Sequence, residues 1–239
     1  MSALVCLHTF KHCANVLESK GYRITEEVAE GPFIEEMAGI GKVAPSAPLR
    51  RDTTDLTGTS SYWLALRRGD DLVGTVAARV DDVDDFEDFA ERGLRRYWLT
   101  DPESQVSVTL PEHLRRMRGQ LVYMGDMFFR KGESGDREKT FCFVHAAHCL
   151  TFVKWPRATM AYAFLRAADG LVKCGEYGFT SGIHYDVAEW VNPPTYRSSR
   201  ECLAMITRAD FESNMAALIR RPDFFSALPM RRPRDHPLK

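Results

Sequence analysis

The sequence predicts an α+β protein built on a mixed sheet, in which antiparallel and parallel strand pairs occur together. Three observations predict this class: a β-hairpin at residues 61–80, a strand–helix–strand unit at residues 119–167, and two further strand-like segments at residues 181–191 and 202–208. A tight turn joins antiparallel strands and a crossover helix joins parallel ones, so the hairpin and the crossover unit together indicate a mixed sheet.

The hairpin is the clearest local signal in the chain. SYWLAL and LVGTVAARV are rich in aromatic, β-branched and aliphatic residues, and the polar turn RRGDD between them contains a Gly-Asp pair. Strand-forming runs on either side of such a turn are typical of a β-hairpin.

The strand–helix–strand unit occupies the middle of the chain. GQLVYMGDMFFR predicts a strand, KGESGDREKT a turn into a helix N-terminus, and FCFVHAAHCLTFVKW a largely buried helix of about three to four turns. ATMAYAFLRA predicts the second strand, and ADGLVKCGEYGF a short helix that ends at Gly178. Such units place ligands beyond the carboxyl ends of their strands.

The remaining segments are predicted to surround this unit. Helices are expected at residues 11–20, 86–97, 112–118 and 211–220, and the segment 31–60, which contains prolines and glycines, is expected to form short helical pieces and loop. We expect three parts: an N-terminal helical and loop extension at residues 1–60 that packs on the main domain, a main domain at residues 61–220, and a basic, proline-broken tail at residues 221–239.

Composition and charge describe an ordinary globular protein. The 239 residues are 44% hydrophobic and 27% charged, and the formal net charge of −1 gives no electrostatic argument for binding nucleic acid or a membrane surface. No apolar run approaches the roughly 20 residues of a membrane-spanning helix. The first residues lack a basic segment followed by a long apolar one, and the six cysteines have no paired CxxC spacing. We therefore expect a cytoplasmic protein with reduced thiols.

The order of elements over residues 61–208 resembles that of the GCN5-related N-acetyltransferase (GNAT) superfamily. YMGDMFFR followed by GESG is similar to the fourth strand and pyrophosphate loop of that family, and CGEYGF is similar to the end of its fourth helix. The sequence departs from both patterns. Only Gly135 fits the loop pattern Gln/Arg-x-x-Gly-x-Gly/Ala, and Cys174 and Glu176 stand where the family commonly has tyrosine and lysine. The chain is therefore interpreted as a divergent member.

This resemblance implies a GNAT-like acyl-CoA N-acyltransferase fold and an enzyme that transfers an acetyl or other acyl group from CoA to an amine. Acetyl-CoA would be the co-substrate, the acceptor would be an amine of a small molecule or peptide, and transfer would be direct, in a ternary complex. The oligomeric state is left open, although a homodimer is compatible with the resemblance, because strands near the C-terminus often pair across subunits in the family.

Two alternatives keep the same fold. One is a domain that binds acyl-CoA or another nucleotide-like ligand with little turnover. The other is a transferase with a different donor, as in acyl-homoserine-lactone synthases or aminoacyl-tRNA-using transferases. The near-neutral charge of the chain counts against a tRNA donor.

The resemblance assigns the cofactor to the end of the central strand and to the turn that follows it. The predicted cofactor-binding residues are Met127, Phe128, Phe129, Gly132, Ser134, Gly135, Asp136 and Arg137. The turn would offer backbone N–H groups and the positive end of the helix dipole to the pyrophosphate, and Gly135 would allow close approach. The alternative is an ordinary polar connection between a strand and a helix.

Gly125 predicts a bulge or a close backbone approach within the central strand. By the resemblance, a bulge would splay this strand from its parallel neighbour and let pantetheine enter the gap, with a backbone N–H beside the thioester carbonyl. The alternative is that the glycine makes room for a nearby aromatic such as Trp63 or Phe164.

Attack of an amine on a thioester requires loss of a proton from the ammonium and protonation of the leaving thiolate. Asp126, beside the predicted bulge, is the candidate base or water-relay group, and Cys174 and Tyr177 are the candidate acids. The alternatives are a surface carboxylate, a buried structural cysteine and a tyrosine that anchors the end of its helix. His184 and Glu189, on the strand after residue 179, are candidate contacts to the acceptor amine.

No metal site is predicted. Cys142, His145, His148 and Cys149 lie close together on the central helix, but that helix is otherwise apolar. Structural zinc sites combine ligands from at least two segments, so core packing is the preferred interpretation. The six acids between residues 81 and 88 lack the calcium-loop spacing and are interpreted as a solvated loop and helix start.

Overall fold

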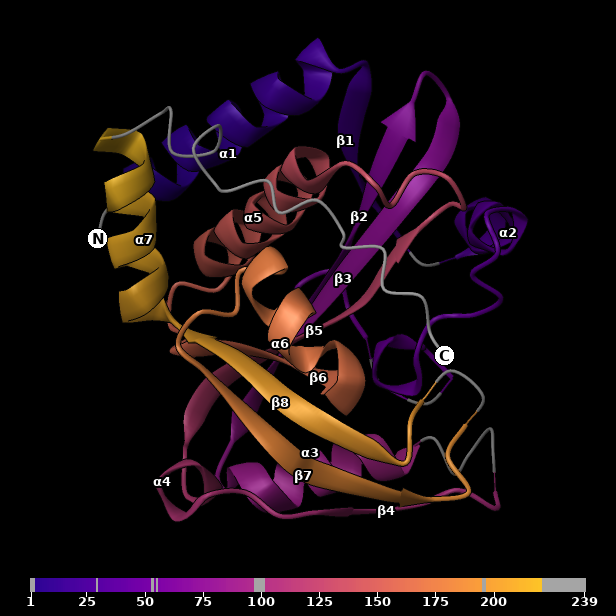
Figure 1. The fold of residues 1–239 in the computed structure, drawn as a ribbon, viewed down its shortest axis with the longest axis vertical. Helices are drawn as coiled ribbons and strands as arrows, with labels where there is room; N and C mark the ends of the chain where they lie inside the picture. Colours follow the sequence, from indigo (N-terminus) through magenta and orange to yellow (C-terminus); the bar gives the residue numbers. More distant parts are fainter. Residues whose placement is uncertain are drawn as a thin grey trace, which may run out of the picture.

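The structure, a computed structural model, describes residues 3–28, 30–52, 54, 56–96, 102–194 and 197–220. Within these residues, helices cover both faces of one eight-stranded sheet with the strand order β1-β2-β3-β5-β6-β8-β7-β4 (Figure 1). The strands are β1 (Tyr22–Glu27), β2 (Ser61–Arg68), β3 (Asp71–Val83), β4 (Gln105–Val108), β5 (Gly119–Phe129), β6 (Met160–Arg166), β7 (Gly182–Val191) and β8 (Arg200–Thr207). The helices are α1 (Ala3–Ser19), α2 (Gly31–Gly39), α3 (Phe86–Arg95), α4 (Glu112–Arg115), α5 (Arg137–Lys154), α6 (Ala167–Glu176), α7 (Arg208–Arg220) and the short 3-10 helix η1 (Ala47–Leu49).

The sheet is mixed, as predicted. β5 and β6 run parallel and are joined by α5, whereas the other neighbouring strands pair antiparallel. β2 and β3 form the predicted hairpin, and β5, α5 and β6 form the predicted crossover unit. The predicted class, a mixed sheet with flanking helices, is confirmed.

Both faces of the sheet are covered, which explains the near-continuous apolar runs of its central strands. On β2, Tyr62, Leu64 and Leu66 belong to the core that includes α1, α5 and α7. Trp63 and Ala65, which alternate with them, belong to the core that includes α2, α3 and α4. One strand therefore contributes to two hydrophobic cores, and in Figure 1 these two groups of helices lie on opposite faces of the sheet.

The sequence analysis missed two strands. β1 reads YRITEE and pairs with β2 at one edge of the sheet, so only part of it is buried and its apolar signal is weak. β4 is only four residues long and pairs with β7 at the other edge, where Val106 and Val108 point into the core. α1 packs along α5, β1 extends the sheet, and α2 and η1 pack on its other face, so the N-terminal segment supplies helices as well as a strand to the fold. The bounds of the extension and of the main domain, 61–220, stay predictions.

Some further boundaries differ from the predictions. α4 ends at Arg115 rather than at residue 118, and β7 does not alternate regularly. The pairing of β7 with β8 shifts between His184 and Ala188, and Asp186 adopts a left-handed conformation with φ of 53°. Residue 97, the predicted end of one helix, and the basic tail 221–239 lie outside the described residues. No described helix has the length and apolar character to cross a membrane.

Candidate functional site

The two parallel strands separate part-way along their length. β5 pairs with β6 only at Leu121, Val122 and Tyr123, although β5 continues to Phe129 and β6 also runs on past its paired residues. A cavity of about 750 Å³ lies beyond the last pair. Both strands line it, together with the start of the segment after α2 and the side of α6 that carries Lys173. We call this cavity the cleft.

A bulge in β5 lies at the wall of the cleft. Thr75 on β3 pairs with Phe128, and Ala77 pairs with Gly125, so Asp126 and Met127 together oppose a single residue of β3. Asp126 has a left-handed backbone with φ of 56°, and its carbonyl oxygen accepts a hydrogen bond of 3.0 Å from Thr75 Oγ1. The predicted bulge is therefore present, and its strained residue is the aspartate rather than the preceding glycine.

Gly125 is required by crowding. A Cβ atom at this position would lie 2.9 Å from Tyr123 Cε1 and 3.1 Å from Leu49 Cδ1. The close neighbours are thus Tyr123 and Leu49, not the aromatic residues Trp63 or Phe164 that the sequence analysis considered.

The carboxylate of Asp126 ties the bulge to the segment after α2. Its side chain is only 4% exposed and lies 2.7 Å from Lys42 Nζ. The backbone N–H of Ser46 also donates to both carboxylate oxygens, at 2.9 and 3.1 Å. Asp126 lines the cleft as predicted, but its oxygens are held by an ammonium and an amide. This geometry favours a positioning role over direct proton abstraction.

Tyr177 also lines the cleft, directly after α6. Burial raises the pKa of its phenol, although the nearby Lys173 acts in the opposite direction. The phenol therefore stays protonated at neutral pH and can donate a hydrogen bond. Its backbone carbonyl oxygen is 2.8 Å from Nε2 of the buried His148, which fixes the end of the helix.

Cys174 is not brought to the cleft. Its Sγ is directed to the carbonyl oxygen of Phe179 at 2.7 Å, and burial raises the pKa of the thiol. It is not among the described residues that line the cleft, whereas Asp126 and Tyr177 are. Its environment is that of a structural cysteine.

The sequence analysis missed a buried charged group at the far wall of the cleft. Glu201 on β8 is 1% exposed and accepts hydrogen bonds from Arg197 Nη1, at 2.9 and 3.1 Å, and from Trp190 Nε1, at 3.1 Å. Arg197 also lies 3.4 Å from the hydroxyl of Tyr123. Alternation along β8 places Glu201 on the same face as Leu203 and Met205, which belong to the core. A carboxylate at a core-facing position was therefore the feature of the sequence that could have identified this residue.

Cations outnumber carboxylates on the described walls of the cleft. The cationic residues are Lys42, Arg50, Arg166, Lys173 and Arg197, and the acidic ones are Asp126, Asp169 and Glu201. Most of these cations are paired with carboxylates: Lys42 with Asp126, Arg197 with Glu201, Arg50 with Asp52 and Lys173 with Glu176.

The residues predicted to bind the cofactor divide into two groups. Met127 and Phe128 line the cleft, whereas the Phe129 ring packs against Phe143 at 6.0 Å between centroids. None of the described residues 130–138, which form the turn and the first residues of α5, lines the cleft. The turn is therefore not part of the wall of this cavity.

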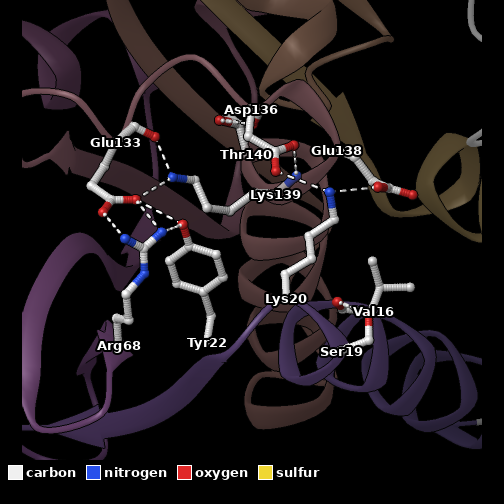
Figure 2. Close-up of polar contacts among 10 residues, drawn as sticks. All are labelled: Val16, Ser19, Lys20, Tyr22, Arg68, Glu133, Asp136, Glu138, Lys139 and Thr140. Carbon is white, nitrogen blue, oxygen red and sulfur yellow. Dashed lines mark hydrogen bonds and ion pairs between the residues drawn. The ribbon is translucent and has the colours of Figure 1, made fainter.

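The turn is held by a buried carboxylate that the sequence analysis did not single out. Glu133 accepts hydrogen bonds from Tyr22 Oη at 2.8 Å and Lys139 Nζ at 2.8 Å, and Arg68 Nη1 lies 3.0 Å from its other oxygen (Figure 2). Burial alone would raise the pKa of Glu133, but the hydrogen bonds from Lys139 and Tyr22 and the charges of Lys139 and Arg68 lower it overall. The carboxylate is therefore ionised at neutral pH.

Further acidic residues surround the start of α5. Asp136 caps the helix by accepting the backbone N–H of Lys139 at 3.0 Å. Lys20 Nζ, which extends from the end of α1, lies 2.9 Å from Asp136 and 2.7 Å from Glu138 (Figure 2). Arg137 pairs with a glutamate of α6 at 3.1 Å. Asp136 and Arg137 thus have partners within the chain, and Gly132, Ser134 and Gly135 are exposed.

The histidines of α5 are packed in the core. Burial, with a smaller effect of His148, lowers the pKa of His145 to about 3, and burial lowers that of His148 to about 4. His145 Nδ1 lies 2.9 Å from the carbonyl oxygen of Phe141. The described residues contain no group of three or more His, Cys, Asp or Glu side chains arranged to hold a metal ion. His184 and Glu189 are not among the described residues that line the cleft.

Comparisons with known proteins find matches only among solved structures. No family model and no curated protein matches the sequence. Among solved structures, an N-acyl amino acid synthase from uncultured soil microbes is 12% identical, with 80% of this chain and 94% of that chain covered and a TM-score of 0.43.

Two further structures share this similarity. Arabidopsis thaliana NAA60 in complex with acetyl-CoA is 10% identical, with 78% of this chain and 99% of that chain covered and a TM-score of 0.45. An acetyltransferase of the GNAT family from Streptococcus pneumoniae is 10% identical, with 77% and 99% covered and a TM-score of 0.41. All three TM-scores are below 0.5, so activity is inferred below from the cleft of this chain and not from these likenesses.

Proposed function

We propose that the protein is an N-acyltransferase that moves an acyl group from a pantetheine thioester, of which acyl-CoA is the common form, to an amine. The observation that carries this proposal is the separation of β5 from β6 beside the bulge at Asp126. Beyond Tyr123, the edge of β5 no longer pairs with β6 and borders the cleft. The amide groups of a pantetheine arm can hydrogen-bond to such an edge much as an added strand does.

The chemistry is a direct transfer. The amine nitrogen attacks the thioester carbonyl carbon, the C–N bond forms, the C–S bond breaks, and the nitrogen gives up a proton while the thiolate takes one. All six cysteines are buried, and no cysteine is among the described residues that line the cleft. This supports transfer in a ternary complex, with no acyl group carried on a thiol of the protein.

We assign Tyr177 as the acid that protonates the leaving thiolate, because its phenol is protonated and lines the cleft. We assign Asp126 as a positioning residue. Its pairs with Lys42 and Ser46 hold the bulge, so that a backbone N–H beside Met127 can stabilise the negative charge that develops on the thioester oxygen.

An activity assay tests this function. Acetyl-CoA and acetyl-pantetheine are each offered with a panel of amines that includes amino acids, and amide products are detected by mass spectrometry. We expect an amide product from at least one pair. Absence of product with every pair would overturn the proposed function.

The role of Tyr177 is tested in the same assay. Tyr177→Phe should lower kcat by about a hundredfold with little change in KM, because it removes the proton donor and keeps the ring. Tyr185→Phe, at an exposed tyrosine on β7, is the matched control and should leave kcat unchanged. Equal rates for Tyr177→Phe and the unaltered protein would contradict the assignment.

A further inference from the structure

Helices α1 and α5 pack against each other and run in opposite directions. Lys20, which follows the last residue of α1, lies 2.9 Å from Asp136, which precedes the first residue of α5. Steps of about two helical turns away from this contact reach cysteines on both helices. They are Cys13 and Cys6 on α1, and Cys142 and Cys149 on α5. The antiparallel register therefore sets each of these cysteines of α1 opposite one of α5.

The four thiols meet in two pairs. Cys6 interacts with Cys149 as a hydrogen-bond partner, and Cys13 interacts in the same way with Cys142. All four side chains are at most 3% exposed and lie in the same hydrophobic core. Ala146, between the two cysteines of α5, is also fully buried, so the residues at this helix contact are small. Small residues let two helix backbones approach closely, which favours the separation of about 4.4–6.8 Å between Cα atoms that a disulfide requires.

The two thiols of the first pair differ in acidity. The hydrogen bond with Cys149 lowers the pKa of Cys6, whereas burial and the same hydrogen bond raise the pKa of Cys149. Because a thiolate and not a thiol attacks a disulfide, Cys6 is the first nucleophile of its pair. α1 lies at the outside of the molecule, and its other face carries the exposed Leu4 and Leu7 (Figure 1). Local separation of α1 from α5 is therefore enough to admit a small reagent to both thiols.

We propose that these are two redox-active dithiol pairs, Cys6 with Cys149 and Cys13 with Cys142, which convert to disulfides and cross-link α1 to α5. The oxidant is a low-molecular-weight disulfide. The thiolate of one cysteine attacks it and releases one small thiolate, and the second cysteine then attacks the mixed disulfide and releases the other. The two cysteine protons pass to the released thiolates, so the pair loses two electrons and the small disulfide becomes two thiols. The cross-links would fasten α1 to the central helix in an oxidising environment and release it in a reducing one.

Disulfide mapping of the folded full chain tests this inference. The reduced protein is incubated with oxidised glutathione, the remaining thiols are alkylated, and unreduced peptides are identified by mass spectrometry. We expect cross-linked peptides that join Cys6 to Cys149 and residue 13 to residue 142. Cys174 and Cys202, whose Sγ atoms are directed to backbone carbonyl oxygens at 2.7 and 3.5 Å, are the internal controls and should be alkylated. Six alkylated cysteines, glutathione adducts without cross-links, or cross-links between other cysteines would each overturn the inference.

Thermal unfolding and a cysteine variant test the consequence of the cross-links. Each disulfide would close a loop of more than half the chain, so oxidation should raise Tm by roughly 10 °C, and dithiothreitol should reverse the change. Cys6→Ala should lose the first cross-link, leave Cys149 open to alkylation and keep the second. Cys174→Ala is the matched control and should form both. An oxidised chain that unfolds at or below the Tm of the reduced chain would overturn the fastening of α1. If Cys6→Ala does not fold, the cross-links mapped in the unaltered chain decide the pairing.

Discussion

Two buried acidic side chains lie near the end of β5, one in the cleft and one in the turn before α5, and their surroundings differ. In the cleft, the pair between Asp126 and Lys42 stands at the wall and leaves a cavity of about 750 Å³. At the turn, the carboxylate of Glu133 is enclosed by the side chains of Lys139 and Arg68. One buried acid therefore borders an open cavity, and the other holds a connection between a strand and a helix together.

The largest effect is expected at the buried pair of the turn. Lys139→Met leaves Glu133 as a buried carboxylate without its ammonium partner, which should lower the free energy of unfolding by about 3–5 kcal/mol. Urea unfolding measures this loss. The double variant with Glu133→Leu removes both charges and should recover most of it. A loss below about 1 kcal/mol in the single variant would show that the turn is not held by this pair.

The second largest effect is expected at the ion pair between Lys42 and Asp126 in the cleft. Lys42→Met removes the cation that holds Asp126, so the free energy of unfolding should fall by about 1.5–3 kcal/mol. Acyl transfer should also fall, by about tenfold in kcat/KM, because the bulge loses a support. Lys131→Met, at an exposed lysine of the turn, is the control and should change neither quantity. Normal activity in Lys42→Met would contradict the positioning role given to Asp126.

Acid unfolding distinguishes the buried carboxylate of the turn. The pKa of Glu133 is lowered in the folded chain, so its pairs contribute full stability above the ordinary glutamate pKa of about 4.3. That contribution is lost as the pH falls through the lower folded pKa. The unaltered protein should therefore lose more stability than Glu133→Gln when the pH is taken below about 4, as followed by urea unfolding at several pH values. If the free energy of unfolding fell equally with pH in the two proteins, the pairs of Glu133 would not be the source of the acid sensitivity.

The smallest effect is expected at the surface of the turn. Lys20 pairs with two carboxylates that are both more than a third exposed, so Lys20→Met should cost less than about 1 kcal/mol and the cost should shrink as salt is added. If Lys20→Met lowered the free energy of unfolding as much as Lys139→Met does, the exposed pairs of Lys20 would hold the turn as strongly as the buried pair.

The sequence predicted the elements whose signals are local. The hairpin and the crossover unit have long apolar runs bounded by turn residues, and Gly125 correctly marked the neighbourhood of the bulge. Lys42, Ser46 and Arg197 could not be found in this way, because they come from loops that only the tertiary fold brings to the cleft. β1 was missed because a half-buried edge strand carries little apolar pattern.

The acids of the turn before α5 were visible in the sequence but were not used in its interpretation. GESGDRE was interpreted through its glycines, although it also contains three acids in six residues, from Glu133 to Glu138. Acids at the start of a helix satisfy the same N–H groups and dipole that a phosphate would need. Asp136 does this for the backbone N–H of Lys139, and an acid at this position was the sequence signal for the cap. The partners Tyr22 and Arg68, which lie on other strands, required the structure.

The contrast between the cleft and the turn is tested most directly by hydrogen–deuterium exchange of the full chain with and without saturating acetyl-pantetheine. We predict that the ligand slows exchange at residues 124–129 of β5 and at residues 41–46, where the unpaired strand edge and the segment tied to Asp126 lie, and leaves residues 130–138 unchanged. Protection at residues 130–138 with no change along β5 would contradict the account, because it would place the ligand at the turn rather than in the cleft.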